Sequence, residues 1–363
     1  MYLKKVIQQM RVQLKSILPV FHKAQVENLI LMVVGMVYAQ SVNLPKVATK
    51  MPLKIQIEGR VQRLERLLAN NKFEPLEVMK PVAIRVLKQV SRRSRKVRLV
   101  MDRSMINDTI NVLHVAVVFH GRALPLGWVE VPHEGMSDLA LQQELLRWVA
   151  GCLPKRVSVS LVADREFHSI WLATWIATSL KWSFGLRIKG NTKIEIDGQM
   201  VDASTLAIKG ACTWHESVKV TTDKAATYRV NFFTEWVVTE DEPWLIITNF
   251  SHPSKVEPAY CRRFGIEEMF SDLKSRGLNL EDTRLTDPKR LLRLLAATAI
   301  AYLWIMEVGL TAVANGWRKY IDNRGQASTL SLCQIGLRWI EDRLTQGLAP
   351  PRFRFRFHLL PDS

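Results

Sequence analysis

Two apolar stretches of the chain end in aspartate, and this pattern constrains the fold more than any other feature of the sequence. Residues 97–102 read V-R-L-V-M-D, and residues 157–164 read V-S-V-S-L-V-A-D. Short apolar runs rich in β-branched residues are typical of buried strands. Further strands are predicted at 110–120 and 124–131, separated from the first by turn residues. Residues 97–131 therefore predict an antiparallel meander.

The segments that follow the meander alternate between helix and strand. A helix is predicted at 137–150 before the second aspartate-ending strand, another helix at 167–180 after it, and a fifth strand at 183–189. Three meandering strands followed by strand–helix units predict a mixed sheet covered by helices, and so an α/β fold.

The pattern divides the chain into three regions. Residues 1–90 carry apolar positions at helical spacing without strand-like alternation, and they predict an N-terminal helical domain. Residues 91–286 form the predicted core, with a β-rich insertion at about 190–250, and residues 287–363 form a C-terminal helical region. The tail reads P-P-R-F-R-F-R-F-H, which fits an edge strand or a nucleic-acid contact.

The charge of the chain favours a polyanionic partner. The 363 residues carry 51 Lys and Arg against 34 Asp and Glu, a net charge of +17, and nucleic acid is the polyanion we expect. Five of the eight residues at 91–98 are basic, which suits a linker or an arm that contacts phosphates. The uncharged runs 29–44 and 294–306 are shorter than the roughly 20 residues of a membrane span, so we expect buried helices and no membrane partner.

Localisation follows from the N-terminus and the cysteines. The N-terminus lacks a long apolar segment, so we expect no secretory signal. The four cysteines are scattered without a C-x-x-C pair, which is typical of reduced thiols in a cytosolic protein. We therefore expect a cytoplasmic protein.

Residues 260–274, Y-C-R-R-F-G-I-E-E-M-F-S-D-L-K, predict an amphipathic helix with an unusual charged edge. At roughly 100° per residue, Tyr260, Arg263, Glu267 and Lys274 lie within an arc of about 60°. An ordinary surface ion pair between Arg263 and Glu267 explains part of this edge. A row of charges that serves a binding site is the alternative.

Asp102, Asp164 and Glu267 are candidate metal ligands. The ends of adjacent strands lie within side-chain reach, and a helix packed over them can add a third carboxylate. Clustered carboxylates need a cation, and an all-oxygen ligand set suits Mg²⁺ or Mn²⁺. Single aspartates at strand ends are also common caps. Asp108 is an alternative first ligand, and Glu268 an alternative to Glu267, although it projects about 100° further round the helix.

Three blocks resemble a known family. Tyr260, Arg263, Glu267 and Lys274 match Y-x-x-R-x-x-x-E-x-x-x-x-x-x-K, the signature of bacterial insertion-sequence transposases of the Y-R-E-K type, insertion-sequence family 4. L-V-A-D-R-E-F-H-S resembles the second-aspartate block of that family, and V-R-L-V-M-D-R-S resembles the first. The resemblance covers about residues 95–290. Glu166 stands where the family often has Gly, and Ser104 where Thr is common.

The resemblance implies an RNase H-like core in which Asp102, Asp164 and Glu267 form a DDE triad that binds two Mg²⁺ or Mn²⁺ ions. It implies cut-and-paste transposition: water attacks a phosphodiester at the element end, and the freed 3′-OH finally joins target DNA. The implied partners are double-stranded terminal inverted repeats, target DNA and a second copy of the chain. Residues 1–90 would recognise the repeats, and the protein would associate with the nucleoid.

The same resemblance suggests roles for the remaining signature residues. Arg263 and Lys274 would hold phosphates beside the scissile one, and Tyr260 would donate its hydroxyl to a phosphate oxygen. Trp244 is the preferred aromatic shelf for a flipped base, with a core tryptophan as the alternative. Two other functions remain open: a stand-alone nuclease or resolvase, and an inactive DNA-binding protein descended from a transposase.

Overall fold

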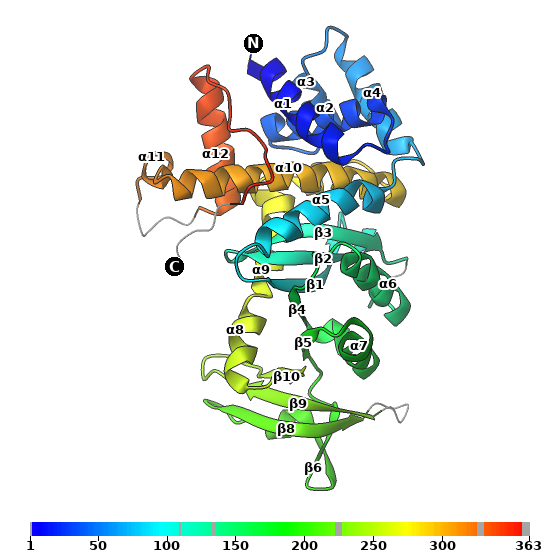
Figure 1. Cartoon of the computed structure of the whole chain (residues 1–363), viewed down its shortest axis with the longest axis vertical. Helices are drawn as coiled ribbons and strands as arrows, with labels where there is room; N and C mark the ends of the chain where they lie inside the picture. Colours follow the sequence, from blue (N-terminus) through cyan, green and yellow to red (C-terminus); the bar gives the residue numbers. More distant parts are fainter. Residues whose placement is uncertain (1, 109, 133–134, 222–226, 325–329, 358–363) are drawn as a thin grey trace.

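The computed structural model describes residues 2–108, 110–132, 135–221, 227–324 and 330–357. It is a mixed α/β protein with three stacked regions: N-terminal helices at one end, a sheet core in the middle, and extended strands at the other end (Figure 1). The long helix α10 (Pro288–Ala314) crosses between the N-terminal helices and the sheet (Figure 1). The mixed sheet and its covering helices confirm the predicted α/β class.

One ten-stranded sheet, ordered β3-β2-β1-β4-β5-β10-β9-β8-β6-β7, runs from the middle of the molecule to its lower end in Figure 1. Its strands are β1 (Lys96–Ile106), β2 (Ile110–Phe119), β3 (Arg122–Glu130), β4 (Ser158–Ala163), β5 (Ser183–Arg187), β6 (Lys193–Ile196), β7 (Gln199–Asp202), β8 (Cys212–Thr221), β9 (Thr227–Glu235) and β10 (Trp244–Thr248). β1, β2 and β3 pair antiparallel, whereas β4 pairs parallel with both β1 and β5. The five strands predicted for the core are therefore present in the predicted order.

The prediction that the first strand ends at Asp102 is wrong. β1 continues to Ile106, and residues 99–106 pair with β2 throughout. β2 supplies hydrogen bonds to β1 beyond Asp102, so β1 continues after its apolar residues end. Asp102 therefore lies inside β1, at the point where the parallel pairing with β4 stops after Met101.

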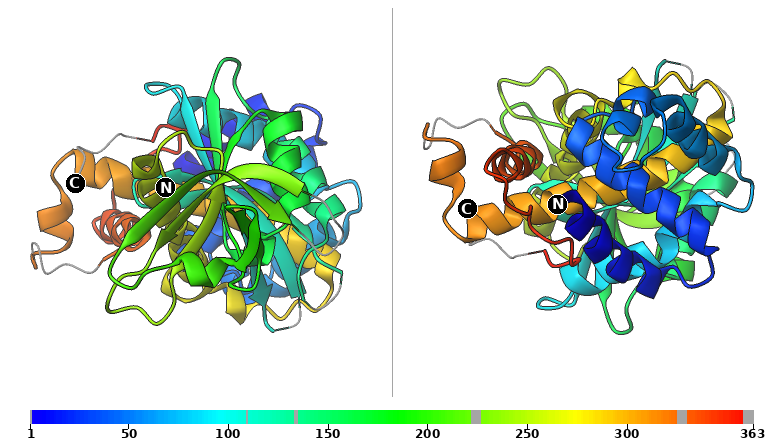
Figure 2. Two further views of the ribbon diagram at one scale, coloured as in Figure 1. Left: turned by 90° about the horizontal axis from the view of Figure 1, so that it is seen from below. Right: turned by 90° about the horizontal axis from the view of Figure 1, so that it is seen from above.

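The β-rich segment predicted at about 190–250 extends the same sheet. β10 pairs antiparallel with β5 and with β9, so the sheet continues without a break into β8, β6 and β7. These strands form the lower end of the molecule in Figure 1 and lie in front in the left view of Figure 2.

Helices cover the sheet and form the opposite end of the molecule (Figure 2). The N-terminal helices are α1 (Tyr2–Ile17), α2 (Lys23–Ala39), α3 (Leu44–Thr49), α4 (Ile57–Ala69) and α5 (Pro75–Val90). The later ones are α6 (Leu139–Ala150), η1 (Arg165–Phe167), α7 (Ile170–Trp175), η2 (Ile176–Leu180), η3 (Ala203–Leu206), η4 (Pro253–Lys255), α8 (Val256–Cys261), α9 (Phe264–Ser271), η5 (Asp272–Arg276), η6 (Leu280–Asp282), α11 (Arg318–Ile321) and α12 (Leu332–Thr345).

α10 joins the N-terminal and C-terminal helices into one core. It begins at Pro288, where the Asp287 side chain caps the helix by accepting the Arg290 N–H, and it packs against α2, α5 and α12. Within the described chain, α10 is the helix long and apolar enough to cross a membrane, yet 94% of its apolar window is buried inside the protein. Its apolar surface is therefore covered by protein, as expected for a core helix.

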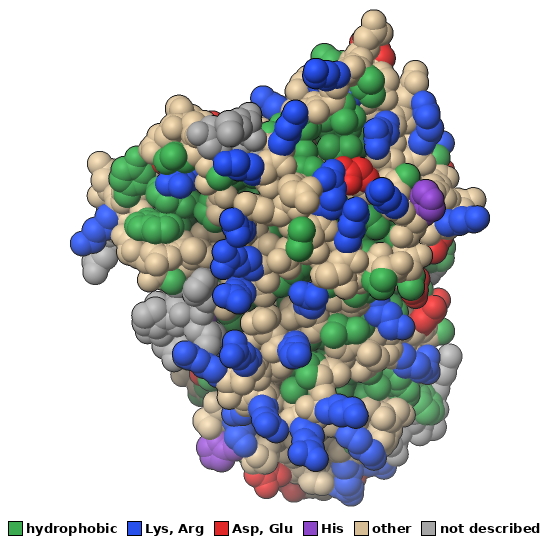
Figure 3. All heavy atoms as spheres, turned by 45° about the horizontal axis from the view of Figure 1, so that its top comes forward, with side chains coloured by type: hydrophobic (Ala, Val, Ile, Leu, Met, Phe, Trp, Pro, Cys, Tyr) green, Lys and Arg blue, Asp and Glu red, His purple; other side chains and the backbone are tan. Residues whose placement is uncertain are grey.

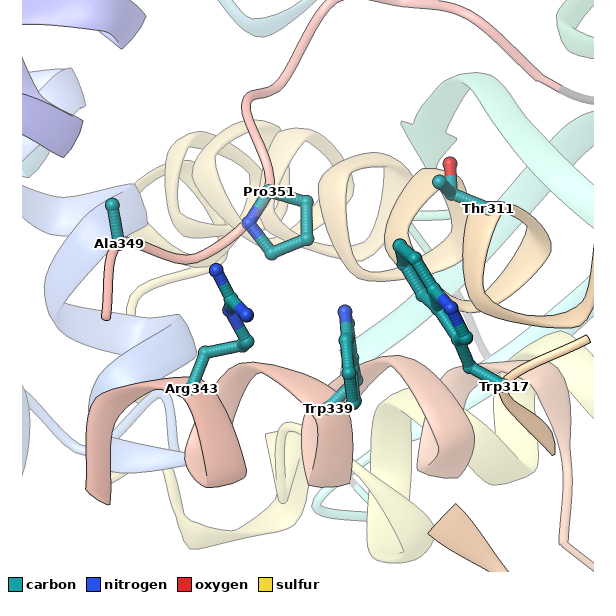
Figure 4. Close-up of a pocket in the computed structure, with 6 residues that line it drawn as sticks. All are labelled: Thr311, Trp317, Trp339, Arg343, Ala349 and Pro351. Atoms are coloured by element: carbon teal, nitrogen blue, oxygen red, sulfur yellow. The ribbon is translucent and has the colours of Figure 1, made fainter. Parts of the chain in front are cut away.

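Two glycines let α10 and α12 cross closely. A Cβ at Gly309 would collide with the carbonyl oxygen of Leu332, and a Cβ at Gly336 would collide with that of Ile305. Beside this crossing, Trp317 stacks on Trp339 with ring centroids 4.9 Å apart. A cavity of about 440 Å³ next to the stack is lined by Thr311, Trp317, Trp339, Arg343, Ala349 and Pro351 (Figure 4).

The described part of the aromatic–arginine tail is irregular and has two different faces. Phe353, Phe355 and Phe357 are buried, whereas the alternating Arg352, Arg354 and Arg356 are exposed. The buried Glu307 carboxylate of α10 accepts the Arg354 N–H at 3.0 Å. Residues 350–357 are thus no edge strand, and His358 lies outside the described residues.

Candidate active site

The register of two parallel strands brings Asp102 and Asp164 together. Met101 of β1 pairs with Ala163 of β4, and an aspartate follows each of these residues. Adjacent strands lie about 5 Å apart, so the two carboxylates share one edge of the β1–β4 pair. Each carboxylate accepts the N–H of the arginine that follows it at 2.8 Å, Arg103 for Asp102 and Arg165 for Asp164.

Asp102 lies in an environment that disfavours its charge. Burial is the main cause that raises its pKa, to about 6 from the ordinary 3.8, and the charges of Asp164 and Glu267 act in the same direction. The Arg103 N–H and the Arg263 guanidinium oppose this rise. Asp164 and Glu267 are therefore both close enough to Asp102 to disfavour its charge.

The predicted helix 260–274 is divided in the structure. α8 ends at Cys261, α9 begins at Phe264, and the turns of η5 are π-helical. Around the break, the N–H groups of Arg263, Gly265 and Ile266 donate to carbonyls three residues earlier. The prediction of one continuous helix is wrong, because the chain tightens at Arg262 and Arg263 and widens after Ser271.

Arg263 lies between two of the acids. Its guanidinium Nη1 is 2.7 Å from Glu267 Oε1 and 3.8 Å from Asp102 Oδ2. Arg263 is 5% exposed, whereas half of the Glu267 side chain is open to solvent. The guanidinium also lies over the Phe264 ring, 4.7 Å from its centroid. The ion pair expected from the spacing is present, and it belongs to the acid cluster.

Tyr260 contacts the second acid. Its hydroxyl donates to Asp164 Oδ1 at 3.2 Å, and the residue is 1% exposed. Burial and the Asp164 charge raise the pKa of Tyr260, so the phenol stays protonated and remains a donor. Trp244, at the start of β10, packs against the Tyr260 ring with centroids 4.9 Å apart. In this structure, Tyr260 therefore orients Asp164, and the half-buried Trp244 supports Tyr260.

Lys274 lies apart from the acid oxygens. It belongs to η5, and its Nζ is 3.8 Å from Glu281 Oε1. Burial lowers the pKa of His114 to about 3, and the Lys274 charge adds to this shift. His114 of β2 pairs with Asp102 across the β1–β2 ladder, so Lys274 acts on a residue next to the first acid and has no ion pair with that acid.

The alternative ligands lie elsewhere. Asp108 is exposed in the turn after β1, with a φ of 53°. The Glu268 carboxylate is 3.4 Å from Arg276 and 3.7 Å from Arg122, on another side of α9 from Arg263. The geometry therefore favours Asp102 over Asp108 and Glu267 over Glu268.

Three residues around the acids were missed in the sequence. Arg187, at the end of β5, places Nη1 3.7 Å from Asp164 Oδ1. Arg103 donates to both oxygens of Glu166 at 3.0 and 2.8 Å. The sequence Asp-Arg occurs at 102–103 and again at 164–165, directly before Glu166. Because both pairs follow neighbouring strands, this repeat was a signal that Arg103 and Glu166 lie close together. Nothing local indicated Arg187, because only the β4–β5 pairing brings it near.

The acids fit a divalent cation by chemistry. Carboxylate oxygens are the ligands that Mg²⁺ and Mn²⁺ prefer, and the raised pKa of Asp102 shows that a neighbouring positive charge would be favourable. Among the described residues, no three potential ligands already converge on one point. Arg263 bridges Asp102 and Glu267, so the guanidinium supplies positive charge where the acids need it.

If Asp164 holds a metal ion for DNA cleavage, as the family resemblance implies, Tyr260→Phe should slow that cleavage by about 10–100-fold, because outer contacts that orient a metal-binding carboxylate have effects of this size. The ring still packs on Trp244, so thermal stability and DNA affinity should stay close to those of the parent. Single-turnover cleavage and equilibrium binding measure the two effects. An unchanged cleavage rate would show that the Tyr260–Asp164 hydrogen bond does not matter for the reaction.

The central part of the chain matches a known protein family. A family model described as "Transposase DDE domain" matches residues 104–304, more than half of the chain. The match begins two residues after Asp102 and includes Asp164 and the Y-R-E-K residues. A comparison with curated protein sequences finds no significant match.

Among solved structures, the chain is similar to a piggyBac transposase synaptic complex with hairpin DNA determined by cryo-EM. The identity is 11%, the TM-score is 0.48, and the alignment covers 94% of this chain and 79% of that chain. The family match over residues 104–304 shows that the chain belongs to the transposase DDE domain family.

Proposed function

We propose that the protein is a DNA transposase of the Y-R-E-K insertion-sequence type that cuts and rejoins DNA at Asp102, Asp164 and Glu267. The observation that carries the proposal is the meeting of three acids from separate elements. Asp102 lies in β1, Asp164 follows β4 and Glu267 lies in α9, and the charges of Asp164 and Glu267 both act on Asp102. Membership of the transposase DDE domain family supports the same function.

We propose that the core is RNase H-like. The support is the order β3-β2-β1-β4-β5, with an antiparallel meander and two further strands running parallel to β1. In the proposed division, residues 1–90 recognise the terminal repeats, residues 91–286 cut DNA and residues 287–363 buttress the core or pair two copies.

When bound, one or two Mg²⁺ or Mn²⁺ ions would activate the attacking oxygen and stabilise the leaving oxygen of a phosphodiester. Asp102, Asp164 and Glu267 would hold the ions. Tyr260 and Arg187 would orient Asp164 through the contacts described above. Arg263 would exchange its carboxylate partners for a phosphate oxygen as DNA enters, because a guanidinium binds both groups through the same donors.

The proposed partners are the double-stranded ends of a mobile element and its target DNA, bound by a dimer. Figure 3 supports a nucleic-acid partner, since Lys and Arg side chains gather over much of the face it shows. The Trp244 ring lies next to the ring of Phe264, which is exposed to solvent. A flipped base would stack on Trp244 by displacing the Phe264 ring. The proposed location is the nucleoid.

The decisive test incubates the protein with Mg²⁺ and labelled DNA that carries the inverted repeats flanking its gene. We expect nicks at the repeat ends, followed by products joined to target DNA. Cleavage without joining would favour a stand-alone nuclease or resolvase. Binding without cleavage would favour an inactive DNA-binding protein of transposase descent.

A further inference from the structure

Five basic side chains line one cavity at the end of β1 and β4 opposite the acids. The cavity has a volume of about 480 Å³ and is here named the basic cavity. Its lining residues are Lys88, Ser91, Arg92, Arg95, Pro154, Lys155, Arg156 and Val157. The five basic residues are exposed, and the lining residues carry no carboxylate.

Two segments far apart in the sequence are tied together to form the basic cavity. The turn after α5 is closed by the Arg95 N–H, which donates to the Ser91 carbonyl at 2.9 Å. The Ser158 N–H then donates to the Arg95 carbonyl at 2.9 Å, which joins this turn to the start of β4. Arg95 and Arg156 adopt positive φ values of 51° and 60°, which residues other than glycine rarely do.

The basic cavity concentrates positive charge without compensation. None of its five basic side chains forms an ion pair with a carboxylate in the described part of the chain. Like charges gathered in this way repel, and a bound polyanion relieves the repulsion. The folded chain therefore holds an arrangement that favours a phosphate backbone.

Two basic side chains of β1, Lys96 and Arg98, lie between the basic cavity and Asp102. Side chains alternate along a strand, so Lys96 and Arg98 lie on the same face of β1 as Asp102. Burial lowers the pKa of Arg262, and the charge of Arg98 lowers it further, so Arg98 lies near the break before α9. Arg95 lies seven positions before Asp102, a span of about 23 Å along the strand.

We propose that the basic cavity binds the DNA backbone about seven base pairs from the phosphodiester that is cut. A duplex that runs along β1 rises about 3.4 Å per base pair, so the span of about 23 Å between Arg95 and Asp102 corresponds to about seven base pairs. The position relative to the cut rests on the function proposed above, whereas phosphate binding by the basic cavity does not. The basic segment 91–98 is thereby assigned to a phosphate contact and is more than a linker.

The test removes three charges from the basic cavity in the variant R92Q/R95Q/K155Q. The matched control K181Q/K289Q/K319Q removes three charges from exposed lysines that lie outside the cavity. Binding of a short fluorescent DNA duplex is measured over a range of salt concentrations. Binding weakens as salt rises, and each lost phosphate contact makes the slope of log K against log salt less steep by about 0.9. We therefore expect the slope to become less steep by roughly 2–3 for the variant and by less than about 1 for the control.

Hydroxyl-radical footprinting on the inverted-repeat duplex tests the position. We expect protected sugars about seven base pairs from the cut in the parent, and loss of that protection in R92Q/R95Q/K155Q. Equal salt slopes for the variant and the control would overturn the inference even if the parent cuts DNA. If the salt slope changes in R92Q/R95Q/K155Q but the parent never cuts DNA, the basic cavity binds phosphate and the proposed function is wrong.

Two further measurements distinguish DNA-backbone binding from misfolding of the variant and from binding of a small anion. The unfolding temperature should be the same for the parent and both triple variants, because the substituted side chains are exposed. If R92Q/R95Q/K155Q unfolds at a lower temperature, the variant K88Q/R156Q is used in its place. Its salt slope must then be less steep than that of the parent by about 1–2. Inorganic phosphate is titrated at constant ionic strength. If the parent binds phosphate more tightly than R92Q/R95Q/K155Q does, while both bind the duplex with equal affinity and equal salt slopes, the cavity is a small-anion site, and the DNA-backbone assignment is wrong.

Discussion

Asp102→Asn is expected to reduce DNA cleavage at least about a thousandfold while leaving DNA affinity nearly unchanged. The substitution removes one of the carboxylates proposed to hold the cation. A bound metal ion stabilises the transition state by several kcal/mol, and the loss of about 4 kcal/mol slows a reaction about a thousandfold. The side chain has the same size and remains inside β1, so the surface offered to DNA is retained. Cleavage of inverted-repeat DNA and equilibrium binding measure the two quantities.

The same substitution should stabilise the protein in the absence of metal. The pKa of Asp102 is about 6 in the folded state and 3.8 ordinarily, so ionisation costs more in the folded chain than in the unfolded chain. This destabilisation grows as the pH rises from about 4 to 6 and is complete above 6. At pH 8, Asp102→Asn should therefore raise the free energy of unfolding by about 1–3 kcal/mol, and the gain should shrink as the pH falls toward 4.

Asp108→Asn is the matched control, since it makes the same chemical change six residues away in an exposed turn. It should keep full activity and the parental pH dependence of stability. Loss of activity in Asp108→Asn, with retention in Asp102→Asn, would move the first metal ligand to the turn. A gain in stability without loss of cleavage in Asp102→Asn would remove Asp102 from the metal site.

Arg293→Met is expected to destabilise the whole chain by about 3–5 kcal/mol. Arg293 lies in α10 and is 5% exposed. Its guanidinium donates to the carbonyl oxygens of Leu68 and Phe73 at 3.0 and 3.2 Å, and to the Asn71 side chain at 3.1 Å. Methionine fills similar space but leaves the buried carbonyl oxygens of Leu68 and Phe73 without this donor, and lost hydrogen bonds to a charged group are costly.

Thermal unfolding measures this effect, and a decrease in Tm of roughly 4–7 °C is expected, because an unfolding entropy of about 2.1 cal/mol/K per residue amounts to about 0.76 kcal/mol/K for 363 residues. Arg290→Met is the control, since Arg290 is exposed in the same helix and should shift Tm by little. An unchanged Tm for Arg293→Met would contradict the role of Arg293. If only an early transition moved, the N-terminal helices would unfold separately from the sheet.

The local sequence was sufficient to predict the order of the core strands along the chain, and it indicated the candidate acids. Apolar runs with β-branched residues mark β1 to β5, because strand periodicity is a local property. The spacing of Arg263 and Glu267 predicted their ion pair, since residues four apart meet on a helix. The motif blocks around Asp164 and Glu267 indicated the family that the match to residues 104–304 shows.

Tertiary structure decided what these residues contact. β2 extends β1 past Asp102, Asp164 receives the Tyr260 hydroxyl and Arg187, and Arg263 bridges two acids. Each contact joins elements far apart in the sequence. Periodicity and spacing describe one element at a time, whereas strand register and helix docking determine which distant side chains meet. The sequence by itself therefore determined the elements and the candidate acids, and only the packing of the elements decided how the acids are charged and held.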